Sequence, residues 1–254
     1  THVITVSCTG FFAPEPGFEI IKQLGLSPAT QRFHLGFMGC FAAFPALKIA
    51  NAFCQAQPDA NVLVVCLELC SIHLQASKAN DNLISASVFS DGAAGLIVNS
   101  QQPSAGGYRL DQFSTAIAEG SEQDMAWTIG DTGFDMVLSS YVPQIIESNL
   151  AQSIQPLFKD YQMSANDITH WAIHPGGRAI LDKVEQSFQL QEPQLASPRN
   201  ILANYGNMSS ATILFVLADL LDRSPSADPE TVLAMAFGPG LTIESGLLTK
   251  TPAS

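Results

Sequence analysis

The sequence has little charge, and positive charge is the scarcest. Only 13% of its 254 residues are charged, and 11 lysines and arginines stand against 23 aspartates and glutamates, which gives a net charge of −12. The basic residues form no cluster. Nucleic-acid binding by counterion release needs clustered Lys and Arg, so a nucleic-acid partner is not expected. So low a charged fraction is also typical of a chain whose surface is partly covered by a partner, and we expect a homodimer.

Long hydrophobic runs and paired cysteines are also missing. The longest apolar runs, such as "NVLVVCLELC" at residues 61–70, are too short to span a membrane, and the first residues lack the basic segment of a secretory signal. The five cysteines are odd in number and lie mostly in apolar contexts, which favours free thiols in a reducing compartment. Cys66 and Cys70 have no second pair or histidines at ligand spacing, so no zinc site is expected. We therefore expect a cytoplasmic protein with no membrane insertion and no metal.

Strand patterns and helix patterns alternate along the chain, which predicts the α/β class. Residues 2–8 and 61–69 read as buried strands, and a helical pattern follows residue 40. A more polar stretch from Gly106 to Gly133 suggests a join between two halves, at residues 1–105 and 106–254. Both halves end in a strand, a tight glycine turn and a second strand, which indicates a duplicated architecture.

Cys40, in the apolar segment "LGFMGCFAAF", is the first candidate for chemistry. A cysteine preceded by glycine and followed by a helical pattern can lie at a strand-to-helix turn, where the helix dipole favours the thiolate. Free cysteine is also among the most buried residue types, so ordinary core packing remains an alternative.

Two downstream positions could act together with a thiol. His174 ends the predicted strand "ITHWAIH" and precedes "PGG", at the strand end where α/β proteins usually build sites. In "NYGNMSSA", an asparagine before a helix could be a simple N-cap, or its amide could bind a developing oxyanion. Cysteine, histidine and asparagine permit nucleophilic acyl chemistry, but these patterns do not show that the three side chains meet.

Seven segments occur in the order found in one enzyme family: "SCTGFFAP", "GFMGCFAAFPAL", "VLVVCLEL", "FSDGAAGLIV", "IHPGGRAILD", "YGNMSSATILFVL" and "FGPGLTIESGLL". Through them the chain resembles the type III polyketide synthases, the chalcone-synthase-like enzymes. "HPGG" and "GNMSSA" fit this family better than the related β-ketoacyl-carrier-protein synthases III. The resemblance implies a thiolase-like fold of duplicated βαβαβ halves in α-β-α-β-α layers, with the first part of the N-terminal half missing.

The same resemblance implies a reaction and three catalytic residues. Cys40 would carry the acyl group, and His174 and Asn207 would hold the thioester carbonyl of malonyl-CoA and stabilise the enolate left by decarboxylation. The enolate would attack the acyl group on Cys40 in a Claisen condensation. The substrates would be an acyl-CoA and malonyl-CoA, and no cofactor is implied.

Further positions map onto the family's substrate-binding cavity. Phe89 matches a phenylalanine between the CoA tunnel and the catalytic cavity, and Met136 falls where plant enzymes have a second one. Cys70, His73 and Cys8 fall on cavity-shaping positions, with ordinary packing as the alternative for each. The remaining members of this expected set are Thr9, Gly238, Pro239 and Gly240.

Variants such as "CLELCSIHL" and "WTIGDTGFDMVLS" resemble the bacterial branch of the family, which includes enzymes similar to alkylpyrone and alkylresorcinol synthases. We therefore expect a pyrone or resorcinol product built on a fatty acyl starter. The chain starts where family members have used about a third of their length, so the part with the CoA-binding basic residues is expected to be missing. Two alternatives remain: a β-ketoacyl-carrier-protein synthase III-like enzyme, and a non-catalytic truncated remnant.

Overall fold

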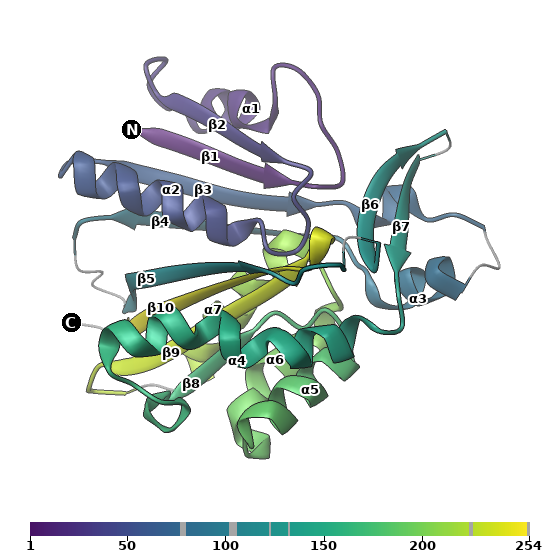
Figure 1. Ribbon diagram of the computed structural model, residues 1–254. Helices are drawn as coiled ribbons and strands as arrows, with labels where there is room; N and C mark the ends of the chain where they lie inside the picture. The colour runs from purple at the N-terminus through teal and green to yellow at the C-terminus, as the bar shows by residue number, and fades with distance from the viewer. Residues whose placement is uncertain (77–79, 102–105, 122, 132, 224–225, 253–254) are drawn as a thin grey trace.

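Two four-stranded sheets and a separate hairpin contain the strands of the described residues (Figure 1). The computed structural model describes residues 1–76, 80–101, 106–121, 123–131, 133–223 and 226–252. The first sheet has the order β2-β1-β3-β4, and its strands are β1 His2–Ser7, β2 Gln31–Gly36, β3 Asn61–Glu68 and β4 Gly92–Asn99. The second has the order β5-β10-β9-β8, with β5 Gly107–Ile117, β8 His170–Ile173, β9 Glu230–Gly238 and β10 Thr242–Thr251. The hairpin consists of β6 Met125–Gly130 and β7 Gly133–Leu138.

Helices and sheets alternate in layers. The helices are α1 Pro16–Leu24, α2 Ala43–Ala56, α3 Asn80–Val88, α4 Val142–Tyr161, α5 Arg178–Phe188, α6 Ala196–Tyr205 and α7 Thr212–Arg223. α1 packs on the outside of the first sheet, α2 and α7 fill the space between the sheets, and α4 and α5 cover the outer face of the second sheet (Figure 1). This α-β-α-β-α arrangement agrees with the fold class predicted from the sequence.

The two sheets repeat one strand pattern. In the first sheet β1 runs parallel to β3, and β4 is antiparallel to β3. In the second sheet β8 runs parallel to β9, and β10 is antiparallel to β9. The duplication suggested by the two strand–turn–strand segments is therefore present in the topology.

Local sequence signals account for the elements around the first sheet. All six residues of β1 are buried because the strand lies between α1 and α2. Gly25 ends α1 with a left-handed φ of 63°, a conformation that glycine adopts without strain. Pro45 lies in the first turn of α2, where its missing N–H costs no helical hydrogen bond.

The strand at residues 61–69, expected to be fully buried, is buried on one face only. In β3, Val62, Val64, Cys66 and Glu68 are buried, whereas Leu63, Val65 and Leu67 between them are half-buried. The reason is that α2 and α7 cover only one face of this part of the sheet, and the described residues leave the other face open.

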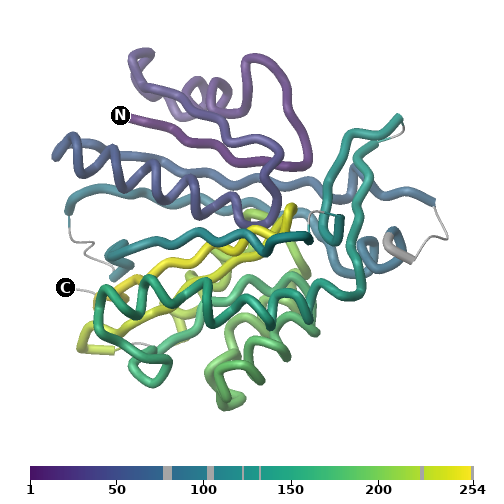
Figure 2. The backbone as a smooth tube through the Cα atoms, in the orientation of Figure 1, coloured from purple at the N-terminus to yellow at the C-terminus, as the bar shows by residue number. Residues whose placement is uncertain are grey.

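The expected division between residues 105 and 106 falls at 102–105, which lie outside the described residues. The segment from Gly106 to Gly133 contains β5 and β6 rather than a linker. The hairpin β6–β7 stands beside α3, away from the two sheets, as the tube in Figure 2 shows. Within the described residues, no helix is both long and apolar enough to cross a membrane.

Candidate active site

Cys40, His174 and Asn207 all line one cavity of about 480 Å³. Six of the other expected binding residues line it as well, namely Cys8, Thr9, Cys70, His73, Phe89 and Met136, and so does Pro239. Gly238 and Gly240 do not line it; a side chain at Gly238 would collide with the ring of Phe41. The structure thus brings together residues from eight separate places in the sequence, spread from Cys8 to Pro239.

Cys40 lies in the turn that joins β2 to α2, as its sequence context predicted. The chain leaves β2 through Phe37 and Gly39, which have φ values of 60° and 85°. A side chain at Gly39 would overlap the ring of Pro239, so a glycine here lets the loop after β9 approach the cysteine. This contact holds the turn with Cys40 against the loop after β9.

Burial raises the pKa of the Cys40 thiol, so without a nearby base the thiol stays protonated. The Sγ atom lies 3.9 Å from Asn207 Oδ1. Loss of hydration raises the pKa of Cys40 to about 11; a hydrogen bond from Ser209 opposes this, and the Glu68 carboxylate adds to it.

His174 follows β8 directly, and its ring is 1% exposed. Its backbone N–H donates to Met235 O at 2.8 Å, which continues the pairing of β8 with β9. Neither ring nitrogen has a hydrogen-bond partner among the described residues. Burial lowers the pKa of His174 to about 3, so the imidazole is a neutral base at physiological pH. Buried polar atoms are nearly always satisfied, so two free nitrogens facing a cavity are suited to a substrate.

Hydrogen bonds at both ends of the Asn207 amide fix its orientation. Its Oδ1 accepts the Ser209 N–H at 2.9 Å, just before the short helical turn Ser209–Ala211, whose N-cap is Met208. That bond orients the amide so that Nδ2 faces the turn after His174, where it donates to Gly176 O at 3.3 Å. One Nδ2 hydrogen remains for another acceptor. Backbone bonds to Val88 and Ser90 hold the residue in place.

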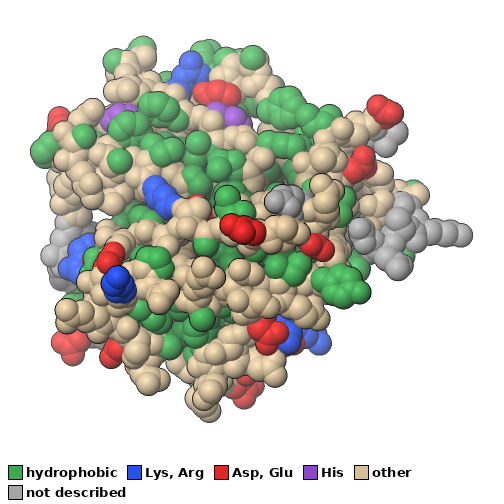
Figure 3. All heavy atoms as spheres, in the orientation of Figure 1, with side chains coloured by type: hydrophobic (Ala, Val, Ile, Leu, Met, Phe, Trp, Pro, Cys, Tyr) green, Lys and Arg blue, Asp and Glu red, His purple; other side chains and the backbone are tan. Residues whose placement is uncertain are grey.

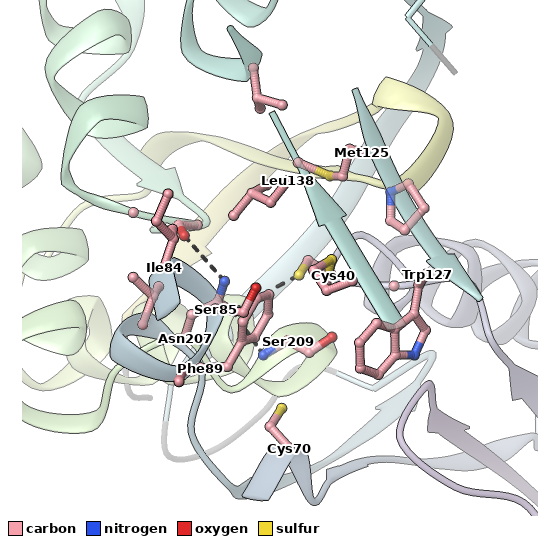
Figure 4. Close-up of a pocket in the computed structure, with 18 of the residues that line it drawn as sticks. Cys40, Cys70, Ile84, Ser85, Phe89, Met125, Trp127, Leu138, Asn207 and Ser209 are labelled. Atoms are coloured by element: carbon pink, nitrogen blue, oxygen red, sulfur yellow. Dashed lines mark hydrogen bonds between the residues drawn. The ribbon is translucent and has the colours of Figure 1, made fainter. Parts of the chain in front are cut away.

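The walls around these groups are largely apolar. Figure 4 shows Phe89 and Asn207 on one side of Cys40, with Met125 and Leu138 above it and Trp127 across from it on the hairpin.

Among the described residues, no group of three or more His, Cys, Asp or Glu could hold a metal ion. All five cysteines are free.

Two family models match the chain. The model described as "Chalcone and stilbene synthases, N-terminal domain" matches residues 1–102, and the corresponding "C-terminal domain" model matches residues 110–252. The chain belongs to the chalcone and stilbene synthase family, the type III polyketide synthases.

Proteins similar to the chain agree with this assignment. "Alpha-pyrone synthesis polyketide synthase-like Pks18" from Mycobacterium tuberculosis is 33% identical over 250 residues, which are 96% of this chain and 64% of that protein. The chain thus spans just under two thirds of the length of the curated relatives it matches.

Two solved structures are also similar. PKS-I from the brown alga Ectocarpus siliculosus has a TM-score of 0.92 at 31% identity, over 98% of this chain and 68% of that one. The 1,3,6,8-tetrahydroxynaphthalene synthase of Streptomyces coelicolor A3(2) has a TM-score of 0.92 at 30% identity, over 99% and 72%. These matches confirm the predicted thiolase-like fold of the family.

A buried carboxylate behind the cysteine was missed by the sequence reasoning. Glu68, at the end of β3, is fully buried and accepts hydrogen bonds from the Cys8 backbone N–H at 3.0 Å and from Thr9 Oγ1 at 2.9 Å. Ser210 Oγ and the Cys8 thiol donate to its other oxygen. The one available signal was a single acidic residue inside the apolar strand "VLVVCLEL".

Cys8 and Cys70 both lie near this carboxylate. Cys8 Sγ is 3.0 Å from Ser209 Oγ, so Glu68, Cys8, Ser209 and Asn207 form a continuous polar chain under the cavity floor. Burial, with Glu68 adding to it, raises the pKa of both thiols well above the usual range. Both residues therefore present neutral thiols to the cavity.

His73 fastens the hairpin that closes one side of the cavity. Its Nε2–H donates to Thr9 O at 2.5 Å, and its Nδ1 accepts the Phe134 N–H at 3.3 Å. Its ring stacks on Phe134 at 4.1 Å. Trp127 adds a second attachment, from Nε1–H to Cys8 O at 2.7 Å. Sequence reasoning placed His73 at the cavity but missed this connecting role.

Replacing His73 with leucine should loosen the hairpin, because the Thr9 carbonyl and the Phe134 N–H lose their partner at a cost of about 1–3 kcal/mol. Hydrogen–deuterium exchange of residues 125–138 should become faster, while exchange in β9 and β10 stays unchanged. His73→Gln, which can still donate to Thr9, should fall between the two. Unchanged hairpin exchange in His73→Leu would show that Trp127 alone holds the hairpin.

Proposed function

We propose that this chain is the catalytic part of a type III polyketide synthase that loads an acyl group on Cys40 and extends it with malonyl-CoA. The observation that carries the proposal is that Cys40, His174 and Asn207 line one apolar cavity, with both ring nitrogens of His174 free of other partners. The names of the similar proteins, all polyketide synthases, support the same reaction.

Loading would begin with proton transfer from Cys40 to His174. Each charged form is unfavourable alone in this cavity, but a thiolate and an imidazolium formed together stabilise each other. The sulfur attacks the acyl-CoA carbonyl, the bond from that carbonyl to the CoA sulfur breaks, and His174 returns the proton to the CoA thiolate.

Chain extension would use His174 and Asn207 to stabilise the negative charge of an enolate. The thioester oxygen of malonyl-CoA accepts hydrogen bonds from His174 and from the free Nδ2 hydrogen of Asn207. When carbon dioxide leaves, the electron pair of the broken bond forms an enolate on that oxygen, and these two donors stabilise it. The enolate carbon then bonds to the acyl carbonyl carbon on Cys40, and the bond to sulfur breaks. Exclusion of water strengthens both hydrogen bonds.

The walls of the cavity support a proposal for the starter and the product class. Ile84, Val88, Met125, Met136 and Leu138 line it, and such side chains suit an alkyl starter. Pks18, a relative named for alpha-pyrone synthesis, supports cyclisation to a pyrone. We therefore propose a fatty acyl-CoA starter and an alkylpyrone or alkylresorcinol product.

We also propose that the protein is a cytoplasmic homodimer. Five free cysteines fit the cytoplasm, and the low charged fraction fits a homodimer. Residues 1–105, with the nucleophile, and 106–254, with His174 and Asn207, would form the two thiolase-like halves.

The test is an assay with radiolabelled malonyl-CoA and starters from acetyl-CoA to palmitoyl-CoA, with Pks18 run in parallel. We expect a labelled pyrone or resorcinol with long-chain starters, and no product from Cys40→Ala. Product from Cys40→Ala would refute the nucleophile. No product from the wild-type chain, while Pks18 is active, would favour a non-catalytic remnant. Preference for malonyl groups on a carrier protein over malonyl-CoA would favour a β-ketoacyl-carrier-protein synthase III-like enzyme.

A further inference from the structure

One hydroxyl in the cavity, that of Ser85 on α3, has no hydrogen-bond partner. Among the described residues that line the cavity, three buried side-chain nitrogen or oxygen atoms make no hydrogen bond. Two are the ring nitrogens of His174, and the third is Ser85 Oγ. Other polar side chains there are bonded, as both ring nitrogens of His73 and the hydroxyl of Thr9 show. Because buried polar atoms are nearly always satisfied, Ser85 Oγ is open to a ligand.

The Ser85 hydroxyl differs from hydroxyls on the outer surface because its Oγ is buried. Much of the face drawn in Figure 3 consists of tan atoms, which are backbone and uncharged side chains, and water can satisfy the polar groups among them. Between largely apolar walls, an unpaired hydroxyl has lost its hydration without gaining a partner on the protein. A ligand with an acceptor at this point gains that hydrogen bond.

The end of α3 places Ser85 next to Asn207. Asn207 N–H donates to Val88 O at 2.8 Å, and Ser90 N–H donates to Asn207 O at 2.9 Å. Ser85 lies four residues before Phe89, whose N–H donates to Ser85 O at 2.9 Å, so the two share one face of the helix. Both line the cavity, and Figure 4 shows them on the same side of it as Asn207. Ser85 is therefore one helical turn away from the strand-like contact between Phe89 and Asn207.

The hairpin side of the cavity is largely apolar. The hairpin contributes the side chains of Met125, Met136 and Leu138. The indole N–H of Trp127 is already bonded to a backbone oxygen. An alkyl chain can pack against these groups without loss, whereas an alkyl chain beside Ser85 would leave its hydroxyl unpaired. The two walls suit two parts of one ligand, an alkyl tail on the hairpin side and oxygen acceptors on the α3 side.

We propose that the Ser85 hydroxyl donates a hydrogen bond to a keto oxygen of the polyketide chain on Cys40 and so orients that chain along α3. This inference rests on the proposed function, because each condensation with malonyl-CoA leaves one keto group in the growing chain. A saturated fatty acyl starter has no oxygen beyond its thioester, so the contact first forms after one extension. Ser85 takes no part in making or breaking bonds; it positions the chain for the next step.

Equilibrium binding of a long-chain β-diketone, which has the keto oxygens of an extended chain but no thioester, tests the contact without turnover. Ser85→Ala should weaken diketone binding about two- to tenfold, the effect of one neutral hydrogen bond, and leave binding of an alkylbenzene of similar length unchanged. Ser85→Thr keeps a hydroxyl and should lose less.

The matched control is Ser87→Ala on the same helix. Ser87 donates to Ile84 O at 2.7 Å, is exposed and does not line the cavity. Its replacement should therefore change diketone binding less than twofold.

A second measurement counts the extensions made from a long-chain acyl-CoA and malonyl-CoA. In Ser85→Ala the ratio of products with two or more extensions to products with one should fall about two- to tenfold, because the diketide loses its positioning contact. The ratio should stay unchanged in Ser87→Ala. A merely structural defect would lower all products alike and leave the ratio as it is in the wild-type chain.

Each other outcome contradicts a different statement. Equal diketone affinity in Ser85→Ala and Ser87→Ala would overturn the contact and leave the proposed function intact. Equal weakening of diketone and alkylbenzene binding in Ser85→Ala would show that Ser85 only shapes the cavity. Weaker diketone binding with an unchanged product ratio would overturn the role in the growing chain. No product from the wild-type chain, with Ser85-dependent diketone binding, would keep the keto-binding site and reject the proposed function; no diketone binding by the wild-type chain would overturn the site itself.

Discussion

Replacing His174 with glutamine should slow alkylation of Cys40 by iodoacetamide at pH 7 by about 10²–10⁴-fold, the usual contribution of a general base. Burial raises the pKa of the Cys40 thiol to about 11, so without a base the thiolate fraction at pH 7 is on the order of 10⁻⁴. In the wild-type chain we expect His174 to act as the base: burial lowers its pKa to about 3, so the ring is neutral and free to take up a proton as the thiolate forms. Peptide mapping would follow Cys40 separately from the other four cysteines.

The pH dependence separates a base from a merely structural histidine. In His174→Gln the rate should rise about tenfold per pH unit from pH 7 to 10, because the thiol titrates above this range. The wild-type rate should vary little between about pH 5 and 8, because His174 stays neutral there. His170→Gln is the matched control, since His170 begins the strand that His174 follows but bonds to Glu230 away from the cavity. Equal rates in His174→Gln and His170→Gln would exclude His174 as the base.

Replacing Glu68 with alanine should lower the free energy of unfolding by about 3 kcal/mol or more, because several buried donors lose their acceptor at once. The donors are the Cys8 backbone N–H and thiol and the hydroxyls of Thr9 and Ser210. Chemical denaturation monitored by circular dichroism measures the change. Ser245→Ala, a buried hydroxyl with no described partner, is the control and should change stability by less than about 1 kcal/mol.

Glu68→Gln should separate the effect of the carboxylate on the stability of the fold from its effect on the reactivity of Cys40. Glu68→Gln keeps the shape, and the hydroxyl of Ser210 can rotate to accept from the new amide, so the loss of stability should be about 1 kcal/mol. The negative charge of Glu68 contributes to the raised pKa of Cys40, so its removal should speed Cys40 alkylation severalfold at pH 7. Slower alkylation in a folded Glu68→Gln variant would contradict this view of the carboxylate.

Much of the local structure around the site could be predicted from short-range patterns. A glycine before Cys40 and helical spacing after it predicted a strand-to-helix turn, and that turn is present between β2 and α2. The apolar run that ends at His174 predicted a strand end, and His174 directly follows β8. Both signals depend only on neighbours along the chain, which is why they succeeded.

Long-range relations could not be read from the residues alone. Cys40 and Asn207 lie 167 residues apart, and only packing of the two halves brings their side chains together. The exposed face of β3 was missed because an apolar strand has the same composition whether one face or both are covered. Glu68 looked like an ordinary strand residue because the donors that satisfy it come from other elements. The motifs that resemble the family supplied what periodicity could not.

We propose that Cys40 carries the growing acyl chain in the cavity it shares with His174 and Asn207. Mass spectrometry of the chain after incubation with a long-chain acyl-CoA, without malonyl-CoA, tests it most directly. We expect one acyl group per chain, located on the peptide that contains Cys40, absent in Cys40→Ala and released when malonyl-CoA is added. An acyl group on any other cysteine, or an unchanged yield in Cys40→Ala, would contradict it.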